Sequence, residues 1–502
     1  MKSSYIPPGW SEAPISDLCH LINGRAFKPT EWAKSGLPIV RIQNLNEPDS
    51  SFNYCDKEVE EKFIIDAGEL LFAWSGTPGT SFGAHIWKGP RAVLNQHIFR
   101  VHIEERHLNK EFFRLALNQR LNTFIEKAHG GVGLGHITKG KFEDTTLYIP
   151  PLNEQRRIVA KLESLLARSH RAKEALDAIP TLLERFRQSV LAAAFRGDLT
   201  ADWRAKHPDI EPASKLLERI RAERRRNWEE AELKKMQSKG KAPRDDAWKD
   251  KYEEPSTPDT RLLPEIPQGW SWVRLPELGE VARGKSKHRP RNDPRLFDGP
   301  YPFIQTGDVA QSNGRIDSAS QSYSELGLAQ SRLFPKGTVC ITIAANIADT
   351  AVLGIDACFP DSVVGVITES RLVSPEYLEL FIRTIKSDLA DFAPATAQKN
   401  INLEVLSEVA IPIPPPEERV EIEGLLNSAL GHINALERTH TYAVRMMSSL
   451  ESSMLSKAFR GELVPQDPND EPASVLLERI RAEREATASS VPKRSRGRRP
   501  AA

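Results

Sequence analysis

One long internal duplication constrains the fold of this chain more than any other feature. The same nine residues, Leu-Leu-Glu-Arg-Ile-Arg-Ala-Glu-Arg, occupy positions 216–224 and 476–484, which lie 260 residues apart in a chain of 502. Shorter sequences recur at nearly the same spacing: Ile-Pro-x-Gly-Trp at 6–10 and 266–270, and Ala-Phe-Arg-Gly at 194–197 and 458–461. This period exceeds the roughly 20 to 50 residues of solenoid and propeller repeats. We therefore expect two similar halves, each with its own core.

Composition indicates a globular protein of a reducing compartment. The four cysteines, Cys19, Cys55, Cys340 and Cys358, show neither a CxxC motif nor the Cys/His spacing of a zinc site, so we expect no disulfide framework and no metal. No segment approaches the roughly 18 apolar residues of a membrane span, and the first ten residues lack the apolar core of a signal peptide. The net charge of +1 neither favours nor excludes a polyanionic partner, because local clusters of charge build the surface potential. We expect a cytoplasmic protein without a cofactor.

Each half begins with a segment, here called a head, that alternates short apolar runs with Gly, Pro and Asn. Residues 68–74 and 337–343 follow turns and are predicted to be strands, whereas residues 111–126 and 375–392 are predicted to be helices. This mixture is typical of an α/β domain. The two heads match in layout but share few residues, so the sequence predicts a common frame with different surfaces.

A long helix is predicted to follow each head, because Pro150-Pro151 and Pro414-Pro415 block an earlier start and favour a helix N-terminus a few residues later. Apolar residues then recur every 3.5 residues over about five heptads, which is typical of a coiled-coil seam. The main seam residues are Ile158, Leu162, Leu165, Leu176, Ile179, Leu183 and Phe186 in the first helix, and Ile422, Leu426, Ile433, Leu436, Met447 and Leu450 in the second. The simplest partner of each helix is the other, paired antiparallel with one head at each end.

Pro180 lies within the first long helix and should kink or break it at a cost of about 3 kcal/mol, whereas the matching residue of the second helix is a valine. Because the seam continues through Ile179 and Leu183, we expect a local defect rather than a domain boundary. From residue 158 to residue 193 the helix would extend about 53 Å, at about 1.5 Å per residue. Such a spacer could hold two heads about one duplex turn apart, roughly 34 to 36 Å, in neighbouring major grooves.

The predicted fold is therefore α+β, with two mixed α/β heads separated by two long antiparallel coiled-coil helices in a pseudo-two-fold tandem repeat. The predicted domains are residues 1–148 (first head), 149–261 (long helix, shorter charged helix and linker), 262–411 (second head), 412–490 (long helix and shorter charged helix) and 491–502 (a basic, disordered tail).

The sequences that open the two long helices, residues 149–158 and 413–419, combine with the paired Gly-Trp and Ala-Phe-Arg-Gly sequences in one order, duplicated at one spacing. In this order they resemble the specificity (S) subunits of type I restriction-modification enzymes, over nearly the whole chain. The resemblance implies two target recognition domains, each reading one half of a split, asymmetric site in double-stranded DNA, with the helices as spacer. It implies as partners two adenine methyltransferase (modification) subunits, held on the helices and adjoining segments, and two ATP-dependent translocase and restriction subunits. The chain itself would not be an enzyme, but would direct adenine-N6 methylation and restriction by those partners.

Candidate DNA-binding residues come from both heads, with phosphate contacts supplying affinity and base-edge contacts supplying sequence preference. Basic residues suited to phosphates are Arg283, Lys285, Lys287, Arg289, Arg291 and Arg295 in the second head, opposed only by Asp293, and Arg25, Lys28 and Lys34 in the first head, against Glu31. Side chains able to read base edges are Gln43, Asn44, Asn95, Gln96, His97, Gln305, Gln398 and Asn400. A solvated run of charge is the alternative for the basic residues, and a structural role is the alternative for the others. Trp74 and Trp87 could stack on bases, but we favour buried core positions for both.

Two glycine-rich sequences imitate nucleotide-binding motifs. Residues 279–286, Gly-Glu-Val-Ala-Arg-Gly-Lys-Ser, match GxxxxGK[ST], but that loop requires a helix directly after it, and Pro290 and Pro294 prevent one. Residues 131–135 follow no apolar strand and are interpreted as a flexible turn. The Asn/Asp-Pro-Pro-Tyr/Phe tetrad of amino-methyltransferases is absent, so catalysis is expected from partners. The main alternative function is a non-enzymatic coiled-coil scaffold that binds proteins rather than DNA, and an ATPase built on residues 279–286 is the second.

Overall fold

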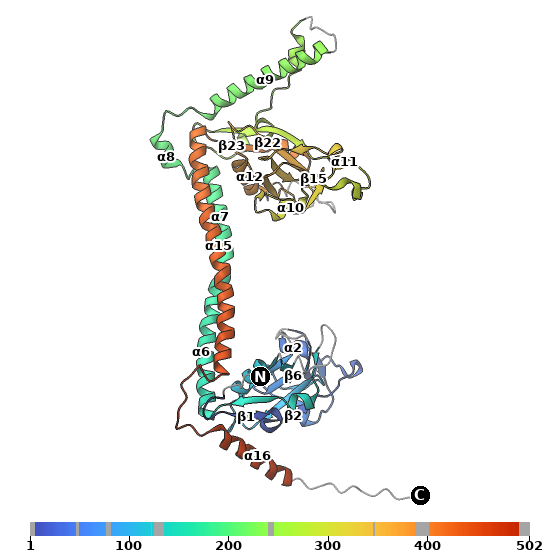
Figure 1. Ribbon diagram of the computed structural model, residues 1–502, viewed down its shortest axis with the longest axis vertical. Helices are drawn as coiled ribbons and strands as arrows, with labels where there is room; N and C mark the ends of the chain where they lie inside the picture. The colour runs from blue at the N-terminus through green and yellow to red at the C-terminus, as the bar shows by residue number, and fades with distance from the viewer. Residues whose placement is uncertain are drawn as a thin grey trace, which may run out of the picture. The chain divides into compact units, whose positions relative to one another are not determined.

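The computed structural model describes residues 6–46, 50–76, 82–121, 123–124, 135–238, 245–344, 347–386, 389 and 401–490. The chain divides into two compact units, one formed by residues 1–177 with 441–502 and the other by residues 178–440. Each unit combines one head with helical segments from both halves of the chain (Figure 1). The predicted basic tail at 491–502 and most of the glycine-rich sequence at 131–135 lie outside the described residues.

The first head contains two four-stranded sheets. One has the order β2-β10-β6-β8 and is antiparallel throughout, and the other has the order β4-β3-β9-β5 with a single parallel pair, β3 and β9. The strands are β1 (Ser11–Pro14), β2 (Cys19–Asn23), β3 (Leu37–Val40), β4 (Asn53–Cys55), β5 (Ile64–Ile65), β6 (Leu70–Ala73), β7 (Ser75–Gly76), β8 (Gly83–Ile86), β9 (Ala92–Leu94), β10 (Ile98–Ile103), β11 (Gly135–His136) and β12 (Thr146–Ile149). The helices are α1 (Ile15–Leu18), α2 (Ile42–Asn46), α3 (Lys110–Gln119) and α5 (Lys139–Glu143), with short 3-10 turns at Pro29–Glu31 and Glu61–Phe63.

The second head repeats this topology. Its sheets have the orders β14-β22-β19-β20-β16 and β17-β15-β21-β18, and the second sheet again has a parallel pair, β15 and β21, at its centre. The first sheet gains a fifth strand, β16, which pairs parallel with β20. The strands are β13 (Ser271–Arg274), β14 (Gly279–Arg283), β15 (Phe297–Phe303), β16 (Arg315–Ile316), β17 (Gln321–Tyr323), β18 (Leu333–Phe334), β19 (Val339–Thr342), β20 (Thr350–Leu353), β21 (Ala357–Cys358), β22 (Val363–Thr368) and β23 (Ala410–Ile413). The helices are α10 (Thr306–Gln311), α11 (Glu325–Ala329), α12 (Pro375–Thr384) and α14 (Leu403–Ser407), with 3-10 turns at Leu275–Glu277 and Pro294–Leu296.

The apolar patterns that predicted these elements also explain their packing. All four residues of β6 are buried, as are all four of β19, because each strand lies inside its sheet with both faces covered. Helix α3 is capped by Asn109, whose side chain accepts a hydrogen bond from the Phe112 amide at 2.9 Å, and the helix buries Phe112 and Phe113. The predicted mixed α/β heads with a common frame are therefore confirmed.

Long helices run out of both heads. They are α6 (Leu152–Asp177) and α7 (Ile179–Phe195) in the first half and α15 (Pro416–Ala458) in the second (Figure 1). The predicted break at Pro180 is confirmed, since α6 ends at Asp177 and Pro180 occupies the first turn of α7, where a missing N–H is tolerated. Ala178, the one residue between these two helices, keeps α-helical backbone angles, with φ −77° and ψ −22°. The two compact units also divide at this place.

The helices pair antiparallel within each unit. In the first unit the start of α6 shares a core with the end of α15, where Ile158 and Leu162 pack with Ala458, and Ser169 Oγ donates to Glu451 Oε1 at 2.6 Å. In the second unit the end of α7 shares a core with the start of α15, and Arg187 Nη2 donates to Glu437 Oε1 at 2.8 Å. The predicted antiparallel pairing is confirmed in both units.

Burial along the predicted seam is uneven. Ile158, Leu162, Leu183, Ile422, Leu426 and Ile433 are buried, Leu165, Leu176, Ile179 and Met447 are half-buried, and Phe186, Leu436 and Leu450 are about half exposed, at 53%, 53% and 46%. The most buried residues near each helix start pack into the core of the adjoining head. The apolar period therefore reflects contacts with a head as well as contacts with the partner helix.

The repeated nine-residue sequence lies on two shorter helices, α9 (Ala213–Ser238) and α16 (Ala473–Ser490), and each docks on the head of the other half. The Ala213 amide donates to Gly269 O at 2.9 Å and Arg221 Nε to Glu277 Oε2 at 2.7 Å, so α9 lies on the second head. The Ala473 amide donates to Gly9 O at 2.9 Å, so α16 lies on the first. A shared docking geometry therefore accounts for the shared sequence. Two further helical segments, α8 (Ala201–Lys206) and the 3-10 turn at Ala247–Lys251, flank α9.

Candidate nucleic-acid interface

The predicted basic residues follow the same strand in both heads and leave the sheet at the same place. In the first head, the amides of Gly24 and Arg25 donate to Ile98 O and Leu94 O at 3.1 and 2.9 Å. In the second head, the amides of Gly284 and Lys285 donate to Val363 O and Phe359 O at 2.9 and 3.1 Å. The backbone that carries the candidate phosphate-binding side chains is thus anchored equivalently in each unit.

The glycine at this anchor is required by close packing. A Cβ atom on Gly24 would lie 2.1 Å from Asn95 O, and one on Gly284 would lie 2.3 Å from Pro360 O. Neither distance is compatible with a side chain, so only glycine lets the backbone pass. This packing accounts for the second glycine of the sequence that imitates a nucleotide-binding loop.

The remainder of that sequence is also occupied by structural contacts. Residues 279–283 form strand β14, and the following amides of Lys287 and His288 both donate to Gln330 Oε1, at 2.5 and 3.0 Å. A phosphate-binding loop presents such amides to its ligand at the start of a helix. Here the amides are bonded within the head, and the next helical element is the 3-10 turn at 294–296. The geometry gives no support to the ATPase alternative.

Acidic partners divide the basic residues of the second head into two groups. Arg295 Nη2 lies 2.7 Å from Asp293 Oδ2, and its hydrogen bond, with that of His288, holds the pKa of Asp293 well below its usual value. Arg291 pairs with Asp361 at 3.0 Å, and Arg283 Nε donates to the Asp361 carbonyl oxygen. Asp361 lies far along the chain from the loop, so the sequence did not predict its contact. Asp293 is therefore not, as the sequence had indicated, the only acidic residue that opposes these cations.

The other group projects outward. Lys285, Lys287 and Arg289 are exposed, and within the described part of the chain none of them forms an ion pair with a carboxylate. Arg289 Nη1 donates to the carbonyl oxygens of Ser286 and His288, both at 2.8 Å, which orders its side chain. These three cations are the residues of the loop best placed to contact phosphates.

The first head is less basic at the matching place. Arg25 pairs with Glu31 and packs on Phe27, with Cζ 4.9 Å from the ring centroid. Lys28 and Lys34 are exposed. The difference in charge between the heads that the sequence predicted is therefore also present on their surfaces.

Several candidate base-reading residues serve local structure. Asn44 is buried, accepts from the Arg41 amide at 3.0 Å and donates to Ser50 Oγ at 3.0 Å. Asn95 Oδ1 accepts from the Gln96 amide at 2.7 Å, and Gln96 Nε2 lies 3.1 Å from His97 Nε2. Gln43 and Gln305 are exposed, whereas Gln398 and Asn400 lie outside the described residues.

Of the two tryptophans expected in the core, Trp87 is buried and Trp74 is only partly buried. Trp87 is 5% exposed and donates from Nε1 to Pro90 O at 2.8 Å. Trp74 is half-buried, stacks on Phe99 with ring centroids 5.8 Å apart and donates to Asn23 Oδ1 at 3.2 Å.

A pair of residues in the first head, half-buried Arg41 and exposed Trp32, was not among the sequence candidates. Arg41 lies over the Trp32 ring, with Cζ 5.5 Å from the centroid, and donates from Nη2 to Gln43 Oε1 at 2.8 Å. Trp32 is 42% exposed. The only signal in the sequence was the alignment of Arg41 with Gln305, which shows unlike polar residues at one position of a shared frame.

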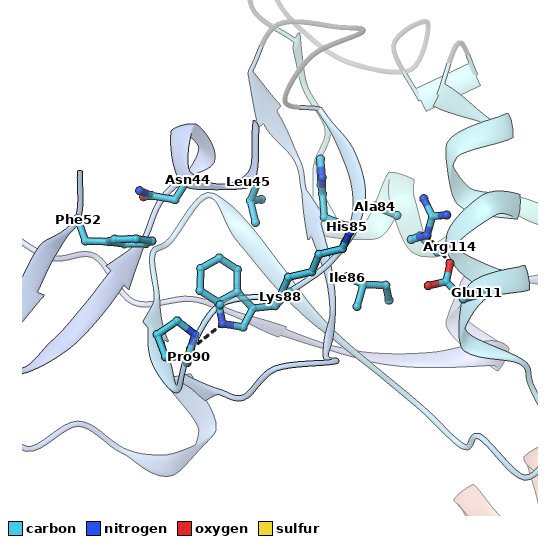
Figure 2. Close-up of a pocket in the computed structure, with 12 residues that line it drawn as sticks. Asn44, Leu45, Phe52, Ala84, His85, Ile86, Lys88, Pro90, Glu111 and Arg114 are labelled. Carbon is cyan, nitrogen blue, oxygen red and sulfur yellow. Dashed lines mark hydrogen bonds and ion pairs between the residues drawn. The ribbon is translucent and has the colours of Figure 1, made fainter. Parts of the chain in front are cut away.

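A hollow of about 510 Å3 lies in the first head beside α2 (Figure 2). It is lined by Asn44, Leu45 and Phe52, by the residues from Ala84 to Pro90 in β8 and directly after it, and by Glu111 and Arg114. Glu111 pairs with Arg114 at 2.7 Å, and the Trp87 ring lies edge-on to Phe52.

Among the described residues, no group of three His, Cys, Asp or Glu side chains could hold a metal ion, and no helix combines the length and apolar character needed to cross a membrane.

Comparison with known proteins gives one family. Residues 7–178 and 267–442 each match the model described as the type I restriction modification DNA specificity domain. The EcoBI specificity subunit of Escherichia coli is 26% identical over 497 residues, covering 96% of this chain and 94% of that protein. The EcoDI specificity subunit, also from Escherichia coli, is 24% identical over 506 residues, covering 97% and 98%.

Two solved structures share the fold. A chain from a study of the assembly and conformational transition of the type I R-M system superposes with a TM-score of 0.66 at 19% identity, covering 91% of this chain and all of that one. The HsdS subunit from Thermoanaerobacter tengcongensis superposes with a TM-score of 0.56 at 18% identity, covering 92% and 99%.

Proposed function

Because the chain belongs to the type I restriction-modification DNA specificity family, as a specificity subunit with two DNA specificity domains, we propose that each head reads one half of a split, asymmetric DNA site. The observation that carries this proposal is the pair of equivalent sheet edges. Both are anchored by a glycine and both carry exposed cations, but their outward side chains differ. Identical heads would suit a palindrome, whereas unlike heads on one frame suit two different half-sites.

Affinity and sequence preference would come from different residues of the same edge. Lys285, Lys287 and Arg289 in the second head, and Lys28 and Lys34 in the first, would contact phosphates. Arg25, Arg283, Arg291 and Arg295 form ion pairs or carbonyl contacts within the head and would position the loops. Gln43 and Gln305 are the exposed candidates for base edges.

The partners that we propose are two adenine methyltransferase subunits and two ATP-dependent restriction subunits, in a cytoplasmic complex. The chain would guide adenine-N6 methylation and cleavage, and the partners would catalyse both. The exposed apolar side chains of the long helices, including Leu182, Phe186, Leu436 and Met446, support a protein-binding surface there. A scaffold that binds proteins alone would explain this surface, but it would leave the exposed cations of the heads without a ligand.

The test is an exchange of heads. Residues 1–148 are replaced by the corresponding head of the EcoBI specificity subunit, and the chimera is expressed with the methyltransferase subunits in a host that lacks other adenine-N6 methylation. Sequencing of methylated sites should show one half-site changed, with the other half-site and the spacer retained. Changes in both half-sites, or the absence of any split motif with the native chain, would contradict the proposal.

A further inference from the structure

One position in the shared frame carries different polar side chains in the two heads. Strand β3 pairs in parallel with β9 and β15 with β21, and each central strand leads into a short helix, α2 or α10. Arg41 precedes α2, and Gln305 precedes α10. The Arg41 amide donates to Asn44 Oδ1 at 3.0 Å, and the Gln305 amide donates to Asp308 Oδ2 at 2.8 Å. The same cap therefore fixes the backbone of both residues, and only their side chains differ.

In the first head two contacts restrict the conformation of the Arg41 side chain. The Arg41 guanidinium is packed on Trp32 and donates to Gln43, and within the described residues it forms no ion pair with a carboxylate. Stacking on an aromatic ring and a hydrogen bond at one edge restrict the rotamers of a long side chain, which lowers the entropic cost of binding. The guanidinium fork matches the O6 and N7 acceptors of guanine in the major groove.

In the second head the equivalent side chain is an amide held in a similar way. Gln305 is exposed, and its Nε2 donates to Gln321 Oε1 at 2.6 Å. A glutamine partner thus orients the outward side chain in both heads. A glutamine amide can donate to N7 and accept from N6 of adenine, which is the pairing that its geometry favours.

The position adjoins the candidate phosphate-binding loop in each head. In the first head, the Asn95 amide donates to Val40 O at 3.1 Å, and Asn95 also forms a bridge with Arg25. In the second, the Ile304 amide donates to Cys358 O at 2.8 Å, and the next residue, Phe359, accepts from Lys285. A side chain at position 41 or 305 therefore lies beside the loop whose cations would follow a DNA backbone, as a base-reading residue must.

We propose that this position determines one base pair of each half-site, with Arg41 reading a guanine and Gln305 reading an adenine. The inference rests on the proposed function, because it requires that the heads bind duplex DNA. It goes further in assigning a named base to a named side chain in each head.

The experiment uses the full chain with its methyltransferase subunits, and the native motif is first established by sequencing methylated DNA. Purified complexes carrying Arg41→Gln, Arg41→Lys or Gln305→Arg are then compared for binding to duplexes with each of the four base pairs at every position of both half-sites. Arg91→Gln removes a surface charge elsewhere in the first head, where Arg91 pairs with Asp66 at 2.8 Å, and is the matched control.

Arg41→Gln should reduce the preference for one guanine·cytosine pair by about 5- to 150-fold, only in the half-site read by the first head. Arg41→Lys should reduce it in part, because an ammonium lacks the planar fork. Gln305→Arg should act on one adenine·thymine pair in the other half-site, and Arg91→Gln should change neither.

Three outcomes would overturn the inference. These are an unchanged base preference in all variants, a uniform loss of affinity at all sequences that Arg41→Lys restores in full, and an altered base pair other than those named. The second outcome would assign a phosphate contact to Arg41. These outcomes differ from a failure of the proposed function itself, because in that case the native complex would show no split motif at all.

Discussion

The junctions between head and helix can be compared in the two units, because each is built on a tryptophan that donates to a buried glutamate. Trp10 Nε1 lies 3.0 Å from Glu154 Oε1, and Trp270 Nε1 lies 2.9 Å from Glu418 Oε2. Glu418 also accepts from Thr200 Oγ1 at 2.7 Å and pairs with Arg204 at 2.8 Å. The second junction therefore neutralises its buried carboxylate within one network.

The first junction does not have the same partners. At the spacing of 264 that aligns the Ala-Phe-Arg-Gly sequences, Thr200 corresponds to Val464 and Arg204 to Pro468. The nearby Arg157 pairs instead with Asp470, at 2.7 Å. Burial consequently raises the pKa of Glu154, although the hydrogen bond from Trp10 opposes the rise. The two halves thus differ at two positions near the matching glutamates, and this difference changes how much the buried carboxylate contributes to stability.

The largest expected effect is that of Glu418→Ala. The change removes the carboxylate acceptor that Arg204, Thr200 and the Trp270 N–H share, and breaking such a buried pair costs about 3–5 kcal/mol. Glu154→Ala removes one hydrogen bond and should cost about 1–3 kcal/mol. Hydrogen exchange followed separately in peptides of each unit would measure both, and equal losses would remove the distinction between the junctions.

Arg204→Met should have the next largest effect. It retains the packing of the aliphatic chain but leaves Glu418 without its cation, at a cost of about 1.5–3 kcal/mol for a charged hydrogen bond. Exchange in peptides of the second unit should rise while that of the first unit stays unchanged. Arg196→Met, at an exposed arginine paired with Asp198, is the control. A similar response in both variants would count against a special role for Arg204.

Thr200→Val places in the second unit the residue type found at the matching position of the first. It should cost about 0.5–1.5 kcal/mol, because one buried hydrogen bond to Glu418 is lost while the side-chain volume is kept. Denaturant unfolding of Thr200→Val and of Thr200→Ser, which keeps the hydroxyl, would separate the hydrogen bond from packing. A larger loss for serine would show that the methyl group matters more.

Glu154→Gln should produce the smallest change, and its sign is informative. The raised pKa of Glu154 means that the folded state binds a proton more readily than the unfolded state, so stability falls as pH rises above the ordinary range of a glutamate. The amide keeps an acceptor for Trp10 and cannot ionise. The variant should be more stable than the native chain at neutral pH and equal to it in acid. Glu418→Gln should be less stable than the native chain at neutral pH. A change in the free energy of unfolding with the same sign in both glutamine variants would refute the comparison.

The shared frame could be predicted because the internal duplication indicates two similar halves, and because prolines and apolar periods determine helices and strands locally. Pro180 predicted a break that the structure contains, and the apolar runs at 68–74 and 337–343 predicted strands β6 and β19. The docking partners of α9 and α16 could not be predicted, because an identical sequence at 216–224 and 476–484 fits either head equally well.

The residue types of the candidate interface could be predicted from the sequence, but their ion pairs and stacking contacts could not. The basic run after Gly284 was visible, yet the ion pair of Arg291 with Asp361 depends on a loop that only the tertiary fold brings close. The stacking of Arg41 on Trp32 has the same origin. Asn44 resembled a base reader because the side chain that caps a turn and the side chain that reads a base are of one chemical type.

The glycine that anchors each basic loop has a consequence for how such proteins diversify. Because Gly24 and Gly284 fix where the chain departs from its sheet, side chains farther out can be replaced without moving the scaffold beneath them. A lineage could then acquire a new preference through a few surface mutations at little cost in folding, while the anchoring residue itself stays under purifying selection.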